Sequence, residues 1–227
     1  MAKTKDELQY AVIVEFDYVA IPGRRMLGEV CAKSFAKDSI PSDVASISRY
    51  VNGRNFAHGL RELCEAKGCA AVDVPSVVAD CQERFASAVA SVSEVSAEFV
   101  AFVKALLEIR SNLKVVIATS SDVAAVKALF SDIDSPNFSV VRITSSIFGG
   151  NAWDSFRILC HNEGLMERLS VAVVGSGAST RGAISAGLGA IAKVCPETDF
   201  EDFTGCDRLT DKLTVDIVDD VKRLLRM

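Results

Sequence analysis

Two kinds of residue that often carry chemistry are scarce in this chain. Histidine occurs only twice, as His58 and His161, and the seven cysteines contain no Cys-x-x-Cys pair. A zinc site needs nitrogen and sulfur ligands at short spacings, and a disulfide framework uses an even number of cysteines. The composition therefore fits neither, and we expect reduced, mostly structural thiols.

Long apolar runs and clusters of positive charge are also missing. No apolar run approaches the roughly 18 residues that a membrane-spanning helix needs. The net charge is −5, and Lys and Arg are spread along the chain. We therefore expect neither a membrane nor a nucleic acid as a partner. The N-terminus is polar, and 49% of the 227 residues are hydrophobic, enough for a good core, so we expect a soluble cytoplasmic protein without a signal peptide.

The order of predicted elements indicates an α/β fold. A buried-looking strand covers residues 11–19. Apolar residues at helical spacing then predict helices with no strand between them, at 26–35, 44–50, 56–66, 77–90 and from 94 onward. From residue 114, strands at 114–118, 140–143, 170–174 and 190–194 alternate with helices at 123–130, 152–163, 181–186 and 214–225. Such alternation predicts βαβ units and a parallel sheet.

Two carboxylates, Glu15 and Asp17, lie near the end of the first predicted strand. Side chains two residues apart in a strand point the same way, so we expect both to project from the carboxyl end of the sheet, where α/β proteins bind ligands. The segment resembles motif I of the haloacid dehalogenase (HAD) superfamily, in which a strand runs into Asp-x-Asp. The resemblance implies that Glu15 stands at the nucleophile position and Asp17 at the general acid/base position.

The layout of the whole chain is similar to a HAD core with an inserted helical cap. The segment Gly53-Arg54-Asn55-Phe56 resembles the middle of the cap in the phosphoglycolate phosphatase and β-phosphoglucomutase branch. The resemblance implies a Rossmannoid parallel-sheet core made of residues 1–20 and 98–227 and an all-helical cap of residues 21–97. Such a cap closes over a small phosphorylated substrate.

Motif II of the family is a hydroxyl side chain at the end of the second core strand. The segment 114–122 matches it, which implies that Thr119, with Ser120 beside it, binds a phosphoryl group. Ser120, Ser121 or Asp122 would also serve as the cap of the following helix. Both interpretations hold together.

Motifs III and IV lack their charged residues. The family lysine falls on Gly150 or Asn151, and the further acids that bind Mg²⁺ fall on Gly175 and Ser179. Glu15 and Asp17 alone would hold Mg²⁺ only weakly, because the ion prefers an octahedral set of oxygens. The resemblance therefore implies a Mg²⁺ site that lacks most of its ligands.

Several residues beside these motifs are candidates to complete a site. Arg142 and Arg157 are the cations nearest to motif III in sequence. Side chains that would line a closed cleft, although packing explains them equally well, are Arg24, Arg25, Arg54, Phe56 and Trp153.

Three hypotheses follow. In the first, phosphoaspartate catalysis has been lost, because the longer side chain at position 15 displaces the attacking oxygen. A shift of ~1 Å lowers the reaction rate about a hundredfold. The protein then binds a small phosphorylated molecule or a protein partner between cap and core. In the second, an active Mg²⁺-dependent phosphohydrolase works on a small phosphorylated metabolite through Glu15 or Asp17. In the third, the Gly-rich segment 175–179 is a phosphate- or mononucleotide-binding loop. We expect the double variant Glu15→Asp/Gly175→Asp to bind Mg²⁺ more tightly with little catalysis.

Overall fold

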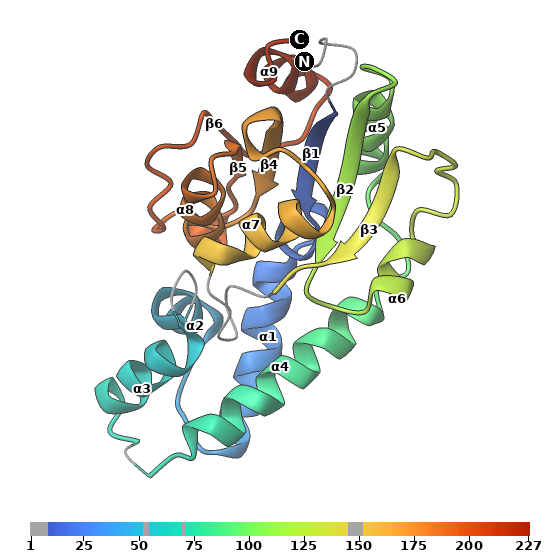
Figure 1. Ribbon diagram of the computed structural model, residues 1–227. Helices are drawn as coiled ribbons and strands as arrows, with labels where there is room; N and C mark the ends of the chain where they lie inside the picture. Colours follow the sequence, from blue (N-terminus) through green and yellow to red (C-terminus); the bar gives the residue numbers. More distant parts are fainter. Residues whose placement is uncertain (1–8, 52–54, 70, 145–151) are drawn as a thin grey trace.

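A parallel sheet forms the centre of the molecule (Figure 1). The structure is a computed structural model, and it describes residues 9–51, 55–69, 71–144 and 152–227. In this part of the chain the strand order is β3-β2-β1-β4-β5-β6. The strands are β1 Tyr10–Glu15, β2 Leu113–Thr119, β3 Phe138–Arg142, β4 Ser170–Val174, β5 Gly189–Lys193 and β6 Arg208–Thr210. The order reverses at β1, and α/β sheets bind ligands outside the carboxyl ends of the strands at such a point.

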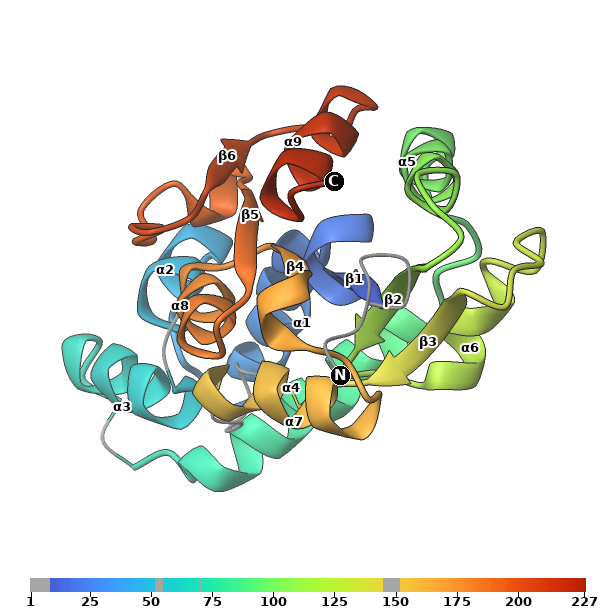
Figure 2. The same ribbon diagram turned by 45° about the horizontal axis from the view of Figure 1, so that its top comes forward.

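Helices cover both faces of the sheet. The helices α5 (Ala97–Leu107) and α9 (Asp216–Leu224) lie on one face, and α7 (Ala152–Asn162) and α8 (Gly177–Ser185) lie on the other (Figure 2). The short helix α6 (Val123–Ala128) follows β2 and packs beside β3. In the described part of the chain, no helix is both long and apolar enough to cross a membrane.

The alternation of side chains along β1 separates two hydrophobic clusters. Val12 and Val14 belong to the cluster that includes residues of α5 and α9, whereas Ala11 and Ile13 belong to the cluster formed with α7 and α8. Because successive strand residues point to opposite faces, Glu15 continues the row of Ala11 and Ile13. It therefore faces α8.

Four helices form a layer beyond the carboxyl ends of the strands (Figure 1). This helical layer consists of α1 Gly23–Lys37, α2 Val44–Val51, α3 Phe56–Ala66 and α4 Val74–Ala90. Three of its helices begin at side-chain caps, since Asp43 accepts the N–H of Ser46, Asn55 accepts the N–H of His58 and Asp73 accepts the N–H of Ser76. The buried faces of all four helices join the same hydrophobic cluster as one face of the sheet. The layer thus covers the edge where a site is expected.

The predicted α/β fold class with inserted helices is confirmed. The bounds of β4 and α3 agree with the prediction, but the first strand ends at Glu15 instead of residue 19, and α8 begins at Gly177 instead of residue 181. The strand β6 was not predicted, because its three residues are too few to show a hydrophobic pattern. The division into a core of 1–20 and 98–227 and a cap of 21–97 stays a prediction.

Candidate functional site

The carboxylate of Glu15 lies against the junction between β4 and α8. Its Oε2 accepts a hydrogen bond from the backbone N–H of Gly175 at 2.9 Å, and its Oε1 accepts one from the hydroxyl of Ser179 at 2.7 Å. Ser179 lies on α8, which is the helix that Glu15 faces. Both oxygens of this buried carboxylate are therefore engaged by the junction.

The carboxylate of Asp17 lies against the segment that follows β2. Its Oδ1 accepts the hydroxyl of Thr119 at 2.6 Å, and its Oδ2 accepts both the N–H and the hydroxyl of Ser120, at 2.8 and 2.5 Å. Thr119 is fully buried and Asp17 nearly so. The hydroxyl groups predicted to hold a phosphoryl group thus hold the carboxylate of Asp17.

The sequence predicted that the two carboxylates project together from one strand, but in the structure they do not. β1 ends at Glu15, and Phe16–Ala20 forms a short π-helical segment. As a result Glu15 turns to the neighbouring strand β4, whereas Asp17 turns to β2. The expected edge of the sheet was correct, but the expected orientation was wrong because the strand stops before Asp17.

Burial raises the pKa of Glu15. Desolvation outweighs the lowering by the N–H of Gly175 and the hydroxyl of Ser179. The positive charge of Arg24 also lowers this pKa, and the charge of Asp17 adds to the rise. The carboxyl group of Glu15 therefore accepts two hydrogen bonds in a buried environment that disfavours its ionised form.

Burial also raises the pKa of Asp17, although hydrogen bonds from Ser120 and Thr119 and the charge of Arg142 act in the opposite direction. Nη1 of Arg142 lies 3.4 Å from the carbonyl oxygen of Ser120. Of the two arginines near motif III, the structure brings Arg142 toward Asp17, whereas Arg157 is exposed on α7. Arg142 is thus a cation that the site acquires from β3.

These raised pKa values predict a dependence of stability on pH. A carboxyl whose pKa is higher in the folded protein binds more protons when folded, so the free energy of unfolding falls as pH rises from about 4 through the raised pKa. Glu15→Gln removes this contribution. We expect the difference in Tm, variant minus wild type, to become more positive between about pH 4 and about pH 7, measured by thermal unfolding. Glu29→Gln, an exposed change on α1, is the control; a difference that stays constant with pH would contradict the rise.

The residues at this edge do not fit the Mg²⁺ site that the HAD resemblance implies. Gly175 and Ser179, at the further acid positions, supply no carboxylate and instead donate to Glu15. A Cβ at position 175 would lie 2.6 Å from the carbonyl oxygen of Tyr18, so an acid cannot be placed there without moving the main chain. Among the residues that the structure describes, no three His, Cys, Asp or Glu side chains gather as a metal site. Mg²⁺ needs several oxygen ligands, and the motif positions of this chain do not supply them.

Protein carboxylates occupy the amino end of α8. The N–H of Gly177 donates to Oε2 of Glu201 at 2.7 Å, and the N–H of Gly175 donates to Glu15. A Cβ at position 177 would lie 2.4 Å from the carbonyl oxygen of Asp202, so the loop carrying Glu201 closes over this turn. A phosphate would need these same N–H groups, which argues against a phosphate- or mononucleotide-binding loop.

Arg24 supplies a buried positive charge beside these carboxylates. Its side chain is 2% exposed, and Nη2 lies 3.3 Å from Oε1 of Glu201. The guanidinium carbon lies 4.5 Å from the centre of the Tyr18 ring, within the range of a cation–π contact. Arg24 thus gives part of the charge balance that the resemblance assigns to a lysine and a metal. The sequence indicated Arg24 only as a cleft residue, and no motif marked Glu201.

The motif III positions Gly150 and Asn151 lie outside the described residues. The sequence has no Lys or Arg between Arg142 and Arg157. A family-type lysine is therefore absent from this segment whatever its conformation.

A small cavity separates the sheet edge from the helical layer. It has a volume of about 250 Å³ and is lined by Ser120 and Arg142 on the sheet side and by Gln82 and Phe85 on α4. Ligand pockets usually exceed ~300 Å³. The space beside Asp17 is therefore small for a metabolite.

The architecture is similar to that of HAD-family hydrolases. CbbY from Rhodobacter sphaeroides, solved in complex with xylulose-(1,5)-bisphosphate, matches with a TM-score of 0.66 and 16% identity over 91% of this chain and 95% of that chain. A HAD family hydrolase from Deinococcus radiodurans R1, solved with bound phosphate and sodium, matches with a TM-score of 0.64 and 15% identity over 95% and 96%. A hydrolase from Pseudomonas syringae matches with a TM-score of 0.67 and 17% identity over 95% and 99%.

These similarities concern the fold. No protein-family model and no curated protein sequence matches the chain. The identities are low, so the chemistry has to be inferred from the site itself.

Proposed function

We propose that this chain, which has the fold of HAD-family hydrolases, does not carry out phosphoaspartate catalysis and acts by binding. The observation that carries the proposal is the position of the Glu15 carboxylate, whose two oxygens accept hydrogen bonds from Gly175 and Ser179. A nucleophile needs a free oxygen aligned with the phosphorus atom. Here the carboxylate is turned toward α8 and joins β1 to the β4–α8 junction.

The donors that would bind a phosphoryl group support the same conclusion. Thr119 and Ser120 direct three hydrogen bonds to Asp17. A phosphoryl oxygen would have to displace the Asp17 carboxylate, and this carboxylate already accepts the three hydrogen bonds. Two of the neighbours were solved with a sugar bisphosphate and with phosphate; in this chain, acids of the protein itself occupy the donors at the edge of the sheet.

One observation favours the second hypothesis, an active phosphohydrolase. A raised pKa suits a general acid, and burial raises the pKa of Asp17. Arg142 would then offer positive charge beside the substrate. This interpretation requires Asp17 to leave Thr119 and Ser120 when substrate binds.

Turnover of phosphate esters separates these two functions. We expect the wild-type protein with Mg²⁺ to hydrolyse p-nitrophenyl phosphate, phosphoglycolate and hexose phosphates no faster than the variant Asp17→Asn, measured by phosphate release. Without an available nucleophile and metal site, most of the usual rate enhancement of ~10⁶-fold or more is lost. We also expect no bound ¹⁹F signal when beryllium fluoride, an acyl-phosphate mimic, is added with Mg²⁺.

The control for this experiment is folding. Asp17→Asn must retain the wild-type circular dichroism spectrum for the comparison to count. Saturable turnover in the wild type that disappears in a folded Asp17→Asn variant would overturn the proposal and support the phosphohydrolase.

A further inference from the structure

A large cavity without Glu15 or Asp17 in its lining lies beside the carboxyl ends of β5 and β6. Its volume is about 1040 Å³. We propose that it binds a small apolar molecule with a single negative charge, such as a medium-chain carboxylic acid, and that Lys193 receives the charged group. The proposal rests on the binding role proposed above and names a ligand class for it.

Apolar groups from two parts of the chain form much of the wall. Ile21 and Pro22 come from the segment that leads into α1, Val194 directly follows β5, and Leu209 lies within β6. Leu209 is 51% exposed and adds an accessible apolar side chain to the wall. A cavity of this size that combines apolar groups with charged side chains has the character of a small-molecule site.

Lys193 is a cation of this wall that can receive an anion. It is the last residue of β5, its side chain is half-buried, and Nζ donates one hydrogen bond to the carbonyl oxygen of Val19 at 2.7 Å. An ammonium has three N–H donors, and among the described residues no carboxylate forms an ion pair with this one. Two donors therefore remain for a ligand.

The Lys193 ammonium is partly desolvated. Desolvation lowers the pKa of Lys193, although the thiol of Cys195 and the carboxylate of Glu98 act in the opposite direction. A partly desolvated ammonium gains more from an added anion than a fully hydrated one does. An anion beside Nζ would therefore be stabilised.

The other two cations of the wall already have partners. Nη2 of Arg24 lies 3.3 Å from Glu201, and Nε of Arg25 lies 3.1 Å from Glu197. Arg25 donates a hydrogen bond to Glu197, whereas the buried guanidinium of Arg24 is paired with Glu201 by charge and forms no hydrogen bond among the described residues. Lys193 is thus left as the cation whose partner is a backbone carbonyl.

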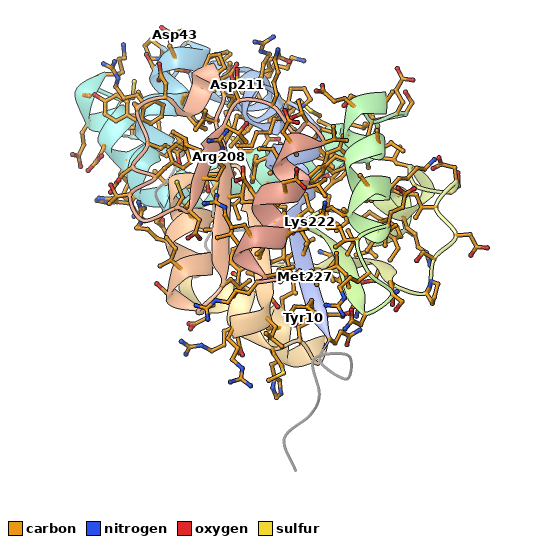
Figure 3. The ribbon with its side chains drawn as sticks, turned by 90° about the horizontal axis from the view of Figure 1, so that it is seen from above. Tyr10, Asp43, Arg208, Asp211, Lys222 and Met227 are labelled. Atoms are coloured by element: carbon orange, nitrogen blue, oxygen red, sulfur yellow. The ribbon has the colours of Figure 1, made fainter. Side chains whose placement is uncertain are left out.

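The acids of the wall restrict the ligand to one negative charge. Asp199 and Asp211 line the cavity and are exposed. In the view of Figure 3, Asp211 lies between Arg208 and Asp43 of the helical layer. These carboxylates would repel a second negative charge, which disfavours nucleotides and sugar bisphosphates. A cationic ligand could only pair with these hydrated acids, and such pairs contribute little.

Binding of octanoate, measured by isothermal titration calorimetry and by ¹H–¹⁵N NMR shifts, tests the proposal. We expect saturable 1:1 binding that Lys193→Met weakens at least tenfold, because methionine keeps an apolar stem but has no charge. Lys104→Met is the matched control on α5, where an exposed lysine pairs with Asp132, and should bind octanoate like the wild type. Leu209→Glu places a carboxylate on an exposed part of the wall, so it tests the site even if Lys193→Met fails to fold.

The charge of the probe provides a second comparison. Octyl phosphate should bind more weakly than octanoate, and octylammonium should not bind in the cavity. Equal octanoate binding by wild type, Lys193→Met and Leu209→Glu would overturn the proposal, as would tighter binding of octylammonium or the absence of saturable binding. Phosphate-ester turnover together with intact octanoate binding would refute only the proposed loss of catalysis, whereas the absence of both would refute only this ligand site.

Discussion

The variant Arg24→Met is expected to lose about 3 kcal/mol or more of the free energy of unfolding, measured by chemical denaturation. The side chain is among the largest that are fully buried, and it pairs with Glu201 at 3.3 Å. Its charge also acts on Glu15. Methionine would leave two carboxylates in the interior without the cation between them, and an uncompensated buried charge is strongly destabilising.

A double-mutant cycle isolates the charge effect from the loss of packing against Tyr18. Glu201→Gln in the Arg24→Met background should recover part of the lost stability, because it removes one unpaired carboxylate. The neighbouring Arg25 is the matched control: its side chain is 63% exposed and pairs with Glu197, so Arg25→Met should change the free energy of unfolding by less than about 1 kcal/mol. Equal losses for the two arginine variants would show that Arg24 is not the buried counter-charge of the site.

Adding a side chain at position 175 is the second change with a large expected effect. We expect Gly175→Ala to lose about 2 to 3 kcal/mol, because its Cβ would overlap with the main chain and Cβ of Tyr18. Gly175→Asp should lose at least as much and gain no affinity for Mg²⁺ in calorimetric titration. The main chain of Tyr18 cannot move away from the new Cβ as easily as the end of a flexible side chain could.

The matched control for this prediction lies on the neighbouring strand. In Gly189→Ala the nearest atom to the new Cβ is a methyl group of Val171 at 3.2 Å, so a much smaller loss is expected. If Gly175→Asp were instead stable and bound Mg²⁺ tightly, position 175 would be an open metal position. For the same reason we expect no tighter Mg²⁺ binding by Glu15→Asp/Gly175→Asp, contrary to the prediction from sequence, because Tyr18 fills the space at position 175.

The sequence by itself determined the sheet, the inserted helices and the edge at which the acids lie. These features come from local patterns: continuous apolar runs such as the one in β4, helical spacing as in α3, and polar residues directly after buried strands. The sequence also showed that the charged residues of motifs III and IV are missing, which depends only on residue identity.

The tertiary structure decided what the remaining charged groups do. Glu15 turns to α8 and Asp17 turns to the end of β2 because β1 ends at Glu15, two residues before Asp17, and neighbouring junctions present donors there. Glu201 reaches the amino end of α8, and Arg24 reaches Glu201, from segments far apart in the chain. Such pairings depend on which residues the folded chain brings together, and no periodicity or motif spacing encodes that. The physical reason is that hydrophobic patterns act locally, whereas a buried charge is stable only with partners that the whole fold supplies.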